Sequence, residues 1–472
     1  MNRIADALSK VLPAARVHTD AESLAAHRTD YWILSHLRAR QGRLDAGPAC
    51  VVRPESAAEV ASALRAAGEL GVAVVPYGAG SGVLGGATPP AGALVIDLRA
   101  MDRLLDLNET ALWVRVQAGM MGNVYEAALH QRGYTGGHFP QSIDLSTVGG
   151  WVATRAAGQF STRYGNIEDL LLGLEAVLPD GTTVRIDPRP RSSTGPSLRE
   201  LFLGSEGTFG VVTEVVLRIF PTPERREVAS FAFATVRDGL EAIRRVVRVG
   251  WRPPVVRLYD ATEATRQFSQ WVPEGQALLL VVSEGPSALV AGEMAAVAQA
   301  AAALGAHPCG AEPVAHWIEH RNTVPSWDFF LDREIVVDTI EVAADWDRVG
   351  DLYERVVASL QQVPGLIVGS AHSSHSYPQG TNLYITFAVK PADWAHAEES
   401  YLDAWGHVLQ TTLECGGTIA HHHGIGRLRT PWLERELRSA YPLLRTLKAA
   451  LDPAGIMNPG VLLPPRPAAS PA

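Results

Sequence analysis

Three glycine-rich segments with few charges place the strongest constraint on how this chain can fold. They cover residues 76–82 (PYGAGSG), the run 134–170 and residues 204–212 (GSEGTFGVV). Long loops of this kind inside a compact domain are commonly binding loops. Because glycine lets the backbone approach a ligand closely, three such loops within about 150 residues indicate one extended, polar-edged ligand.

The first of these loops has the spacing of a dinucleotide fingerprint but stands in a different context. Gly80, Gly82 and Gly85 follow a predicted strand in the pattern G-x-G-x-x-G. A Rossmann loop must open a helix whose N-terminus holds the pyrophosphate. Pro89 and Pro90 stand where that helix would continue, and they do not allow it. The loop alone is equally compatible with a nest of backbone N–H groups around a diphosphate and with a tight connection between strands.

Several elements can be placed around these loops. Residues 57–70 carry apolar side chains at helical spacing, with Ser56 as N-cap and Gly71 as the stop. Asp180 and Gly181 form a two-residue turn signal, which predicts a hairpin.

The order of predicted helices, strands and loops divides the chain into four parts. We expect a helical lead-in over residues 1–45, a cofactor domain over 46–223, a second α+β domain over 224–410 and a C-terminal helical segment over 411–472 with a frayed tail. In the second domain strands and helices alternate, and residues 341–362 are predicted to form one long amphipathic helix.

Composition excludes several classes of protein. The chain has 472 residues, 47% of them hydrophobic, so it can bury large cores and is not disordered. Its net charge of −9 argues against nucleic acid as the main partner. Cys50, Cys309 and Cys415 form no C-x-x-C pair, and no segment is typical of a signal peptide or a membrane span. These features predict a cytoplasmic enzyme.

Several motifs together resemble one flavoprotein superfamily. Residues 76–82, 140–158 and 204–221 are similar to the FAD-binding domain of the vanillyl-alcohol oxidase / p-cresol methylhydroxylase superfamily. Within it, GHFPQSIDLSTVGGWVATRAAG, YGNIEDL, SSTGP and HHHGIGRLR resemble the alkyldihydroxyacetonephosphate synthase family. The likeness covers roughly residues 50–462, most of the chain.

The resemblance implies an α+β fold with a two-subdomain FAD-binding domain and a cap domain built on an antiparallel sheet flanked by helices. The substrate would lie between the two. The FAD would be non-covalent, because the first loop offers no histidine for attachment. The residues implied to hold it are Pro76, Tyr77, Gly78, Ala79, Gly80, Ser81, Gly82, Pro140, Gln141, Ser142, Asp144, Ser146, Thr147, Gly150, Ala153, Thr154, Arg155, Ala156, Glu206, Gly207, Gly210, Val211 and Val212.

The histidine triplet is the most unusual polar cluster in the chain. His421, His422 and His423 lie between GGTIA and GIG, a glycine-flanked turn that can bring several imidazoles to a site. Adjacent histidines can also be incidental in a surface loop. Imidazole exchanges protons near neutral pH without large pKa tuning. By resemblance, one of the three is the base that activates an incoming nucleophile.

Three further residues have roles by resemblance. Tyr384 lies in a predicted strand, where a tyrosine is commonly a packed aromatic, but the matching family tyrosine exchanges a proton with a substrate carbon near the flavin. Arg257, also in a predicted strand, is compatible with an ordinary surface charge. The resemblance implies instead that it orients the acid group of the substrate. His138 is implied to lie close to the flavin.

The residues at the candidate metal positions do not favour a metal site. His372 and His375 are a candidate pair, since the related D-2-hydroxy-acid dehydrogenases use two histidines and a glutamate. In this chain Tyr384 stands at the second histidine position and His422 at the glutamate position. Loss of the carboxylate and one imidazole leaves a poor divalent site, so no metal is expected.

One departure concerns the substrate. The synthase family carries a phosphate-contacting arginine at a position that falls around Trp327 here. Arg321 or Arg333 could replace it after a gap; otherwise a phosphorylated substrate is doubtful.

The leading hypothesis is a synthase-like enzyme that exchanges an acyl group for a long-chain alcohol through a covalent intermediate between flavin N5 and the substrate. The alternative is FAD-dependent oxidation of a D-2-hydroxy acid or another alcohol. A flavin-binding protein without turnover is a third reading, disfavoured by the proton-transfer residues. The expected partners are a small-molecule or lipid-like substrate and a second copy of the chain in a homodimer, with peripheral membrane association left open and no nucleic acid.

Overall fold

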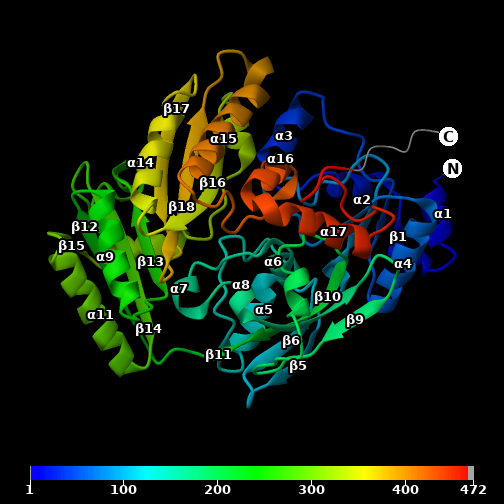
Figure 1. The fold of residues 1–472 in the computed structure, drawn as a ribbon, viewed down its shortest axis with the longest axis horizontal. Coiled ribbons are helices and arrows are strands. Elements are labelled where there is room, and N and C mark those ends of the chain that lie inside the picture. Colours follow the sequence, from blue (N-terminus) through cyan, green and yellow to red (C-terminus); the bar gives the residue numbers. More distant parts are fainter. Residues whose placement is uncertain (1, 466–472) are drawn as a thin grey trace.

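The computed structural model describes residues 2–465, which form three main sheets and their flanking helices (Figure 1). The first sheet has the order β1-β2-β4-β3, with β2, β4 and β3 parallel. The helix predicted over residues 57–70 is confirmed as α4, and the Ser56 side chain accepts from the Glu59 N–H. The bounds are β1 (Val17–His18), β2 (Cys50–Val52), α4 (Ala57–Leu70), β3 (Val74–Tyr77) and β4 (Leu94–Asp97).

The second sheet is antiparallel and has the order β5-β6-β10-β8-β9. Its β8–β9 hairpin turns at Asp180 and Gly181 as predicted, with Gly181 at φ +83°. Helices α5 and α6 pack on it. The bounds are β5 (Leu104–Asn108), β6 (Trp113–Gln117), α5 (Gly122–His130), α6 (Val148–Thr154), β8 (Leu171–Val177), β9 (Thr183–Ile186) and β10 (Val211–Arg218).

The third sheet is antiparallel with the order β15-β12-β14-β13-β17-β18-β16. Its strands are β12 (Arg225–Phe233), β13 (Val255–Tyr259), β14 (Ala277–Gly285), β15 (His307–Gly310), β16 (Val336–Asp345), β17 (Leu366–Ser373) and β18 (Gly380–Val389). The helices on its outer face are α9 (Val236–Arg248), α11 (Ser287–Ala302), α14 (Val349–Leu360) and α15 (Ala397–Glu414) (Figure 1).

Both faces of the third sheet are covered. Leu279 and Val281 of β14 pack in the outer core, whereas Leu278, Leu280 and Val282 pack toward α10 (Ala261–Phe268) and α12 (Glu312–His320). This alternation explains why β14 is apolar at nearly every position instead of every second one.

The single long helix predicted over residues 341–362 is wrong in its first part. Residues 341–345 belong to β16, where Glu341 pairs with Tyr384 and Asp345 pairs with Gly380. The helix α14 begins only at Val349. Ten paired positions along β18 favour the strand over the local helix preference of this alanine-containing stretch.

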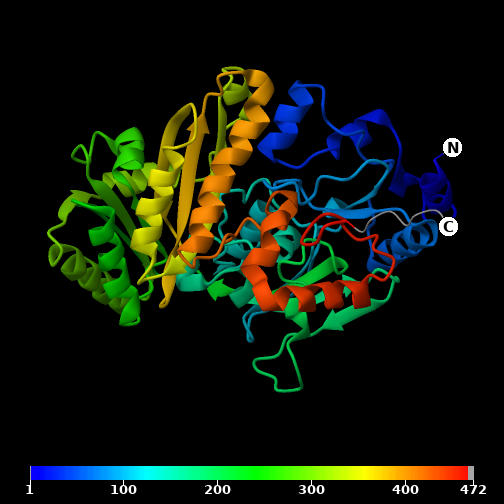
Figure 2. The same ribbon diagram turned by 45° about the horizontal axis from the view of Figure 1, so that its top comes forward.

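Segments from both chain ends lie near the junction of the sheets. In both ribbon views α16 (Gly426–Leu437) and α17 (Tyr441–Leu451) lie between the third sheet and the first (Figure 2). Trp32, with Ile33 and Leu37 of α3 (Ile33–Arg40), packs into the outer core of the third sheet. The part of the expected frayed tail at residues 466–472 lies outside the described residues.

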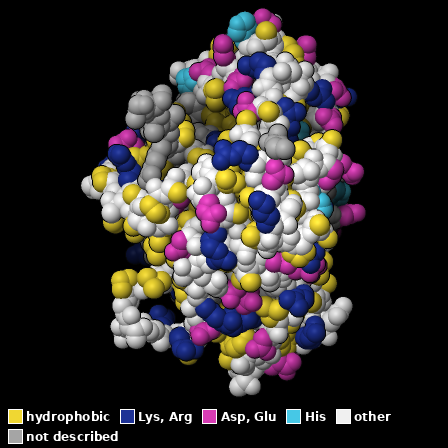
Figure 3. Space-filling view, turned by 90° about the vertical axis from the view of Figure 1, so that its right-hand side faces the viewer, with side chains coloured by type: hydrophobic (Ala, Val, Ile, Leu, Met, Phe, Trp, Pro, Cys, Tyr) yellow, Lys and Arg dark blue, Asp and Glu magenta, His cyan; other side chains and the backbone are white. Residues whose placement is uncertain are grey.

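The α+β class is confirmed by this topology. No helix within residues 2–465 is both long and apolar enough to cross a lipid bilayer. Basic and acidic side chains are interspersed on the face seen in Figure 3.

Candidate active site and cofactor cavity

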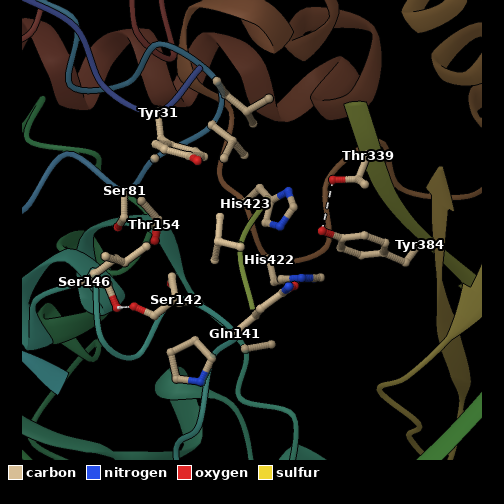
Figure 4. A pocket seen from close by; sticks show the side chains of 18 of the residues that line it. Tyr31, Ser81, Gln141, Ser142, Ser146, Thr154, Thr339, Tyr384, His422 and His423 are labelled. Atoms are coloured by element: carbon tan, nitrogen blue, oxygen red, sulfur yellow. Dashed lines mark hydrogen bonds between the residues drawn. The ribbon is translucent and has the colours of Figure 1, made fainter. Parts of the chain in front are cut away.

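One large cavity lies between the glycine-rich loops and the third sheet. Its volume is about 1120 Å³, above the ~300–1000 Å³ typical of small-molecule sites. Ser81, Ser146 and Thr154 face it from the loop side, and His422, His423 and Tyr384 face it from the opposite side (Figure 4). A cavity of this size has room for a cofactor and a substrate together.

The loop at residues 78–82 presents open backbone amides to the cavity. All five residues line the cavity, and none of their backbone N–H groups donates to an acceptor within residues 2–465. Gly80 has φ +70°, and a Cβ there would overlap the Tyr77 hydroxyl. A Cβ at Gly78 would overlap the Thr147 hydroxyl. Several open amides in one tight loop form a nest that suits a diphosphate, so the loop fits FAD.

Nearly all residues expected to hold the cofactor line this cavity. They are Pro76, Tyr77, Gly78, Ala79, Gly80, Ser81, Gly82, Pro140, Gln141, Ser142, Asp144, Ser146, Thr147, Gly150, Ala153, Thr154, Ala156, Glu206, Gly207, Gly210 and Val212.

Two expected cofactor residues lie away from the cavity. Val211 is completely buried in the core under α4, because alternation along β10 turns Val212 to the cavity instead. Arg155 caps α6 in a left-handed conformation, and its side chain lies 3.4 Å from Glu168. Neither side chain is placed to contact a ligand in the cavity.

Glu206 binds the loop at residues 421–426, which carries the three histidines and which we call the histidine loop. Its carboxylate accepts from the N–H groups of Ile425 at 2.7 Å and Gly426 at 2.9 Å, at the start of α16. Burial raises the pKa of this carboxyl to about 7, although both N–H groups favour its charged form. Glu206 therefore joins the third glycine-rich segment to the loop that carries the triplet.

A row of functional side chains crosses the third sheet. Strand pairing places Tyr259, His372, Tyr384 and Glu341 side by side on β13, β17, β18 and β16. The rings of His372 and Tyr384 stack with centroids 4.7 Å apart. Arg257 donates from Nε to the Tyr259 hydroxyl at 2.6 Å, and its Nη2 lies 2.6 Å from His372 Nε2.

The Tyr384 hydroxyl faces the cavity and accepts one hydrogen bond. Thr339 donates to its hydroxyl oxygen at 2.9 Å, which leaves the phenolic proton for another acceptor (Figure 4). Burial raises the pKa of Tyr384 well above its ordinary value, so the phenol is neutral at physiological pH.

The three histidines occupy different positions. His422 and His423 line the cavity, and their rings lie 5.9 and 5.6 Å from that of Tyr384. His421 lies behind them, with Nε2 2.8 Å from the Tyr377 hydroxyl and Nδ1 2.7 Å from His422 Nδ1. Burial lowers the pKa of His421 to about 4 and that of His422 well below its usual range, so both are neutral bases at pH 7.

A buried ion pair supports His423. Glu341 and Arg429 are both fully buried, and Nη1 and Nη2 of the arginine donate to the two carboxylate oxygens at 2.7 and 2.9 Å. Burial opposes the ionisation of Glu341, but the adjacent Arg429 charge holds its pKa well below the usual range. Glu341 Oε2 also lies 2.8 Å from His423 Nδ1, although the ring N–H is poorly aligned with it. No local sequence pattern indicates this pair, because its members are 88 positions apart.

His138 does not reach the cavity wall. Its ring packs against Trp151 at 4.7 Å, and neither ring nitrogen has a partner within residues 2–465. Burial lowers its pKa to about 3, so it is a neutral core histidine behind the cofactor loops. The expectation that His138 lies close to the flavin stays a prediction.

His375 joins the histidines in a way that the sequence reasoning missed. One ring nitrogen each from His375, His421 and His422 lie within 4.8 Å of one another, and three imidazoles are a known ligand set for zinc. Nitrogens of these rings are hydrogen-bonded within the protein: the Ser161 hydroxyl lies 2.7 Å from His375 Nδ1. His422, which stands at the glutamate position of the related dehydrogenases, supplies one of these three imidazoles.

Open backbone amides opposite neutral imidazoles and a phenol are the arrangement of a cofactor-dependent enzyme. Residues 48–187 match the model for an FAD binding domain, and residues 222–462 match the C-terminal domain of FAD linked oxidases. The chain therefore belongs to the FAD-linked oxidase family, and it binds FAD.

Two relatives span most of this chain. It is 34% identical to the uncharacterized FAD-linked oxidoreductase YgcU of Escherichia coli (strain K12), over 88% of this chain and 89% of that protein. It is 30% identical to the alkyldihydroxyacetonephosphate synthase of Dictyostelium discoideum, over 91% of this chain and 75% of that one.

Two solved structures share the fold. A structure of alkyldihydroxyacetonephosphate synthase matches with a TM-score of 0.80 at 26% identity, over 98% of this chain and 85% of the other. One of p-cresol methylhydroxylase with substrate bound matches with 0.78 at 16% identity, over 98% and 97%. The expected superfamily and its fold are confirmed.

Proposed function

We propose that this FAD-dependent enzyme exchanges the acyl group of a small ester for a long-chain alcohol, as in the synthase branch of the family. In the net reaction the bond between the substrate carbon and the acyl oxygen breaks and a carboxylate leaves. The alcohol oxygen forms the new bond to the same carbon, and its proton is released. No electrons are gained or lost overall, which suits a site rich in proton-transfer groups.

The cavity offers one proton donor and two bases for these steps. When bound, FAD supplies the electron-accepting ring system that side chains lack. Tyr384 holds the proton that is exchanged with the substrate carbon, since Thr339 occupies its lone pair and leaves its O–H free. His422 or His423 takes the alcohol proton, because both line the cavity beside Tyr384.

The observation that carries the proposal is a change in polarity along the sheet. Beyond Tyr384 the lining pairs are Thr339 with Thr386 and then Val337 with Ala388. Ile335, Ile367 and Phe330 continue the lining beyond them. At ~3.4 Å per residue the wall becomes apolar about 14 Å from Tyr384. We name this region the apolar arm. A long aliphatic chain fits it, whereas a short hydroxy acid leaves it unused.

The test is an exchange assay on the FAD-loaded enzyme. Labelled fatty acid should enter acyl-dihydroxyacetonephosphate, and long-chain alcohol should displace the acyl group, without net bleaching of the flavin. Anaerobic mixing with a panel of D-2-hydroxy acids is the counter-test. Bleaching there without any exchange would replace this proposal by the oxidation of an alcohol.

A further inference from the structure

The C-terminal segment at residues 448–458 binds the cofactor loops from outside the cavity. None of the residues in this described segment lines the cavity, and none was expected to hold the cofactor. The buried side chain of Asn458 donates from Nδ2 to the carbonyl of Gly86 at 2.8 Å and to that of Glu206 at 2.7 Å. Both acceptor residues line the cavity: Gly86 follows the first glycine-rich segment, and Glu206 lies in the third.

The two acceptors determine the orientation of the Asn458 amide. Both are carbonyl oxygens, which only accept hydrogen bonds, so both must face the NH2 group and not the amide oxygen. The Oδ1 atom is buried and has no partner within residues 2–465. One planar amide with two diverging N–H bonds therefore spans the two loops and holds their carbonyls at a fixed separation.

A buried ion pair supports the turn that carries Asn458. The Asp452 carboxylate is fully buried and accepts from two backbone N–H groups of the turn, at 2.9 and 3.1 Å. Lys448 Nζ lies 2.7 Å from Asp452 and donates to the Thr208 carbonyl at 2.8 Å. The segment thus contacts the third glycine-rich segment at two carbonyls, those of Glu206 and Thr208.

The backbone of Asn458 is strained and also contacts the first sheet. Its φ is +39°, in a region that residues with side chains rarely adopt and that asparagine tolerates better than most. Its N–H donates to the Val74 carbonyl at 2.8 Å, at the start of β3. Strand β3 leads directly into the first glycine-rich segment. Asn458 therefore contacts the chain both before and after that segment.

We propose that Asn458 is a positioning residue for the cofactor: its side-chain amide sets the separation of the first and third glycine-rich segments and thereby the affinity for FAD. The two segments face the same cavity, so a change in their separation alters the contacts of a ligand held between them. FAD binding is common to every reaction considered for this chain. The role of Asn458 therefore goes beyond the proposed exchange and is independent of it.

The experiment measures FAD affinity on the complete chain. Native protein and each variant are dialysed against a series of free FAD concentrations, and bound FAD is read from the flavin absorbance. Asn458→Gly removes the amide but accepts the positive φ, so it separates the hydrogen bonds from the backbone conformation. Asn458→Asp keeps the size of the side chain and replaces the NH2 group by an oxygen, which cannot donate to two carbonyls.

We expect the dissociation constant for FAD to rise at least tenfold in both Asn458 variants. Asn2→Gly is the control, because Asn2 also joins distant segments, by donating to the Ala49 carbonyl at 2.6 Å, but does not line the cavity. Its FAD affinity should equal that of the native chain. If Asn458 served only the conformation of the turn, Asn458→Gly would bind FAD as the native chain does, and that result would overturn the proposed role.

Hydrogen exchange of the native chain gives a second test that needs no variant. Coupling between a ligand and a contact is reciprocal, so FAD should slow amide exchange at residues 456–458 more than in α1 (Arg3–Leu8). Equal slowing in the two segments would also overturn the role of Asn458. Failure of the acyl exchange assay, with an FAD affinity that depends on Asn458, would instead refute the proposed reaction and leave this role standing.

Discussion

Arg429 and Glu341 form a fully buried, two-fold hydrogen-bonded ion pair under the histidine loop. The arginine also donates to the carbonyl of Gly424, and the N–H of His423 donates to Glu341 at 2.8 Å. The pair thus ties α16 and the loop to strand β16 of the third sheet.

Breaking this pair should be costly. Arg429→Met leaves the Glu341 carboxylate buried without its partner, and such a loss lowers the free energy of unfolding by about 3–5 kcal/mol. Urea unfolding followed by fluorescence measures the change. Arg237→Met, which removes exposed pairs with Asp351 and Glu354, is the control and should cost less than about 1 kcal/mol. Equal losses in the two variants would contradict the importance of burial.

Activity should persist below the pKa of an ordinary histidine. His422 stays neutral because its pKa is lowered by burial, so kcat/KM for the exchange should not fall as the pH drops from 8 to about 6. A decline centred near pH 6.5 would contradict this.

The thermal stability of the protein, unlike its activity, should fall as the solution is made more acidic. The folded pKa of His421 is about 4 and its unfolded value is 6.5, so its contribution is complete above pH 6.5 and is lost as the pH falls toward 4. The thermal midpoint should therefore fall over this range, and less steeply in His421→Gln. An unchanged slope in that variant would count against the assignment.

Removal of the Tyr384 hydroxyl should abolish turnover but not cofactor binding. Tyr384→Phe should lose roughly 10²–10⁴-fold in exchange rate, the usual contribution of a placed proton donor. The flavin absorbance should be retained. Tyr353→Phe removes a hydroxyl bonded to Asp260 outside the cavity and serves as the control. Full exchange activity in Tyr384→Phe would remove the role proposed for this residue.

The first glycine-rich loop should tolerate no side chain at Gly80. Gly80→Ala forces a Cβ into the Tyr77 hydroxyl at a positive φ, so FAD should bind more weakly while the fold remains. Fluorimetric titration of the apoprotein with FAD measures this. Gly92→Ala has a similar φ of +78° and open space, so it isolates backbone strain from the collision. Comparable FAD affinities in the two variants would argue against a cofactor role for the loop.

Chelation should leave the enzyme active. His375 and His421 are already hydrogen-bonded to Ser161 and Tyr377, so the cluster needs no cation to satisfy its ring nitrogens. Dialysis against EDTA should change neither the FAD content nor the exchange rate, with elemental analysis before and after as the control. Loss of activity restored by zinc would establish a metal site at the three histidines.

The sequence predicted the parts whose signals are local. The Ser56 cap and the Gly71 stop define α4 because both act within one turn of the helix. The Asp180–Gly181 turn determines its own hairpin in the same way. The beginning of α14 was misplaced because five pairings with β18 decide the conformation of residues 341–345, and no local pattern reports them.

The supporting contacts of the site could not be predicted, since they join distant segments. Glu206 reaches residues 425 and 426, and Ser161 reaches His375, across more than two hundred positions. The contacts of Trp317 could not be predicted for the same reason. Its ring lies near Arg257 and Arg321 only because α12 packs on the third sheet.

The contact between Glu206 and the start of α16 forms late in the synthesis of the chain, because its two sides are far apart in the sequence. The glycine-rich loops are complete once Val212 has been translated, about 200 residues before the triplet, which at ~5–20 residues per second is a delay of roughly 10–40 s. Throughout that interval the Glu206 carboxylate has no backbone partner from residues 425 and 426. Asn458 also donates to the carbonyls of Gly86 and Glu206, so the loops around the cavity and the histidines opposite them both gain their final contacts only after the C-terminal segment has been made.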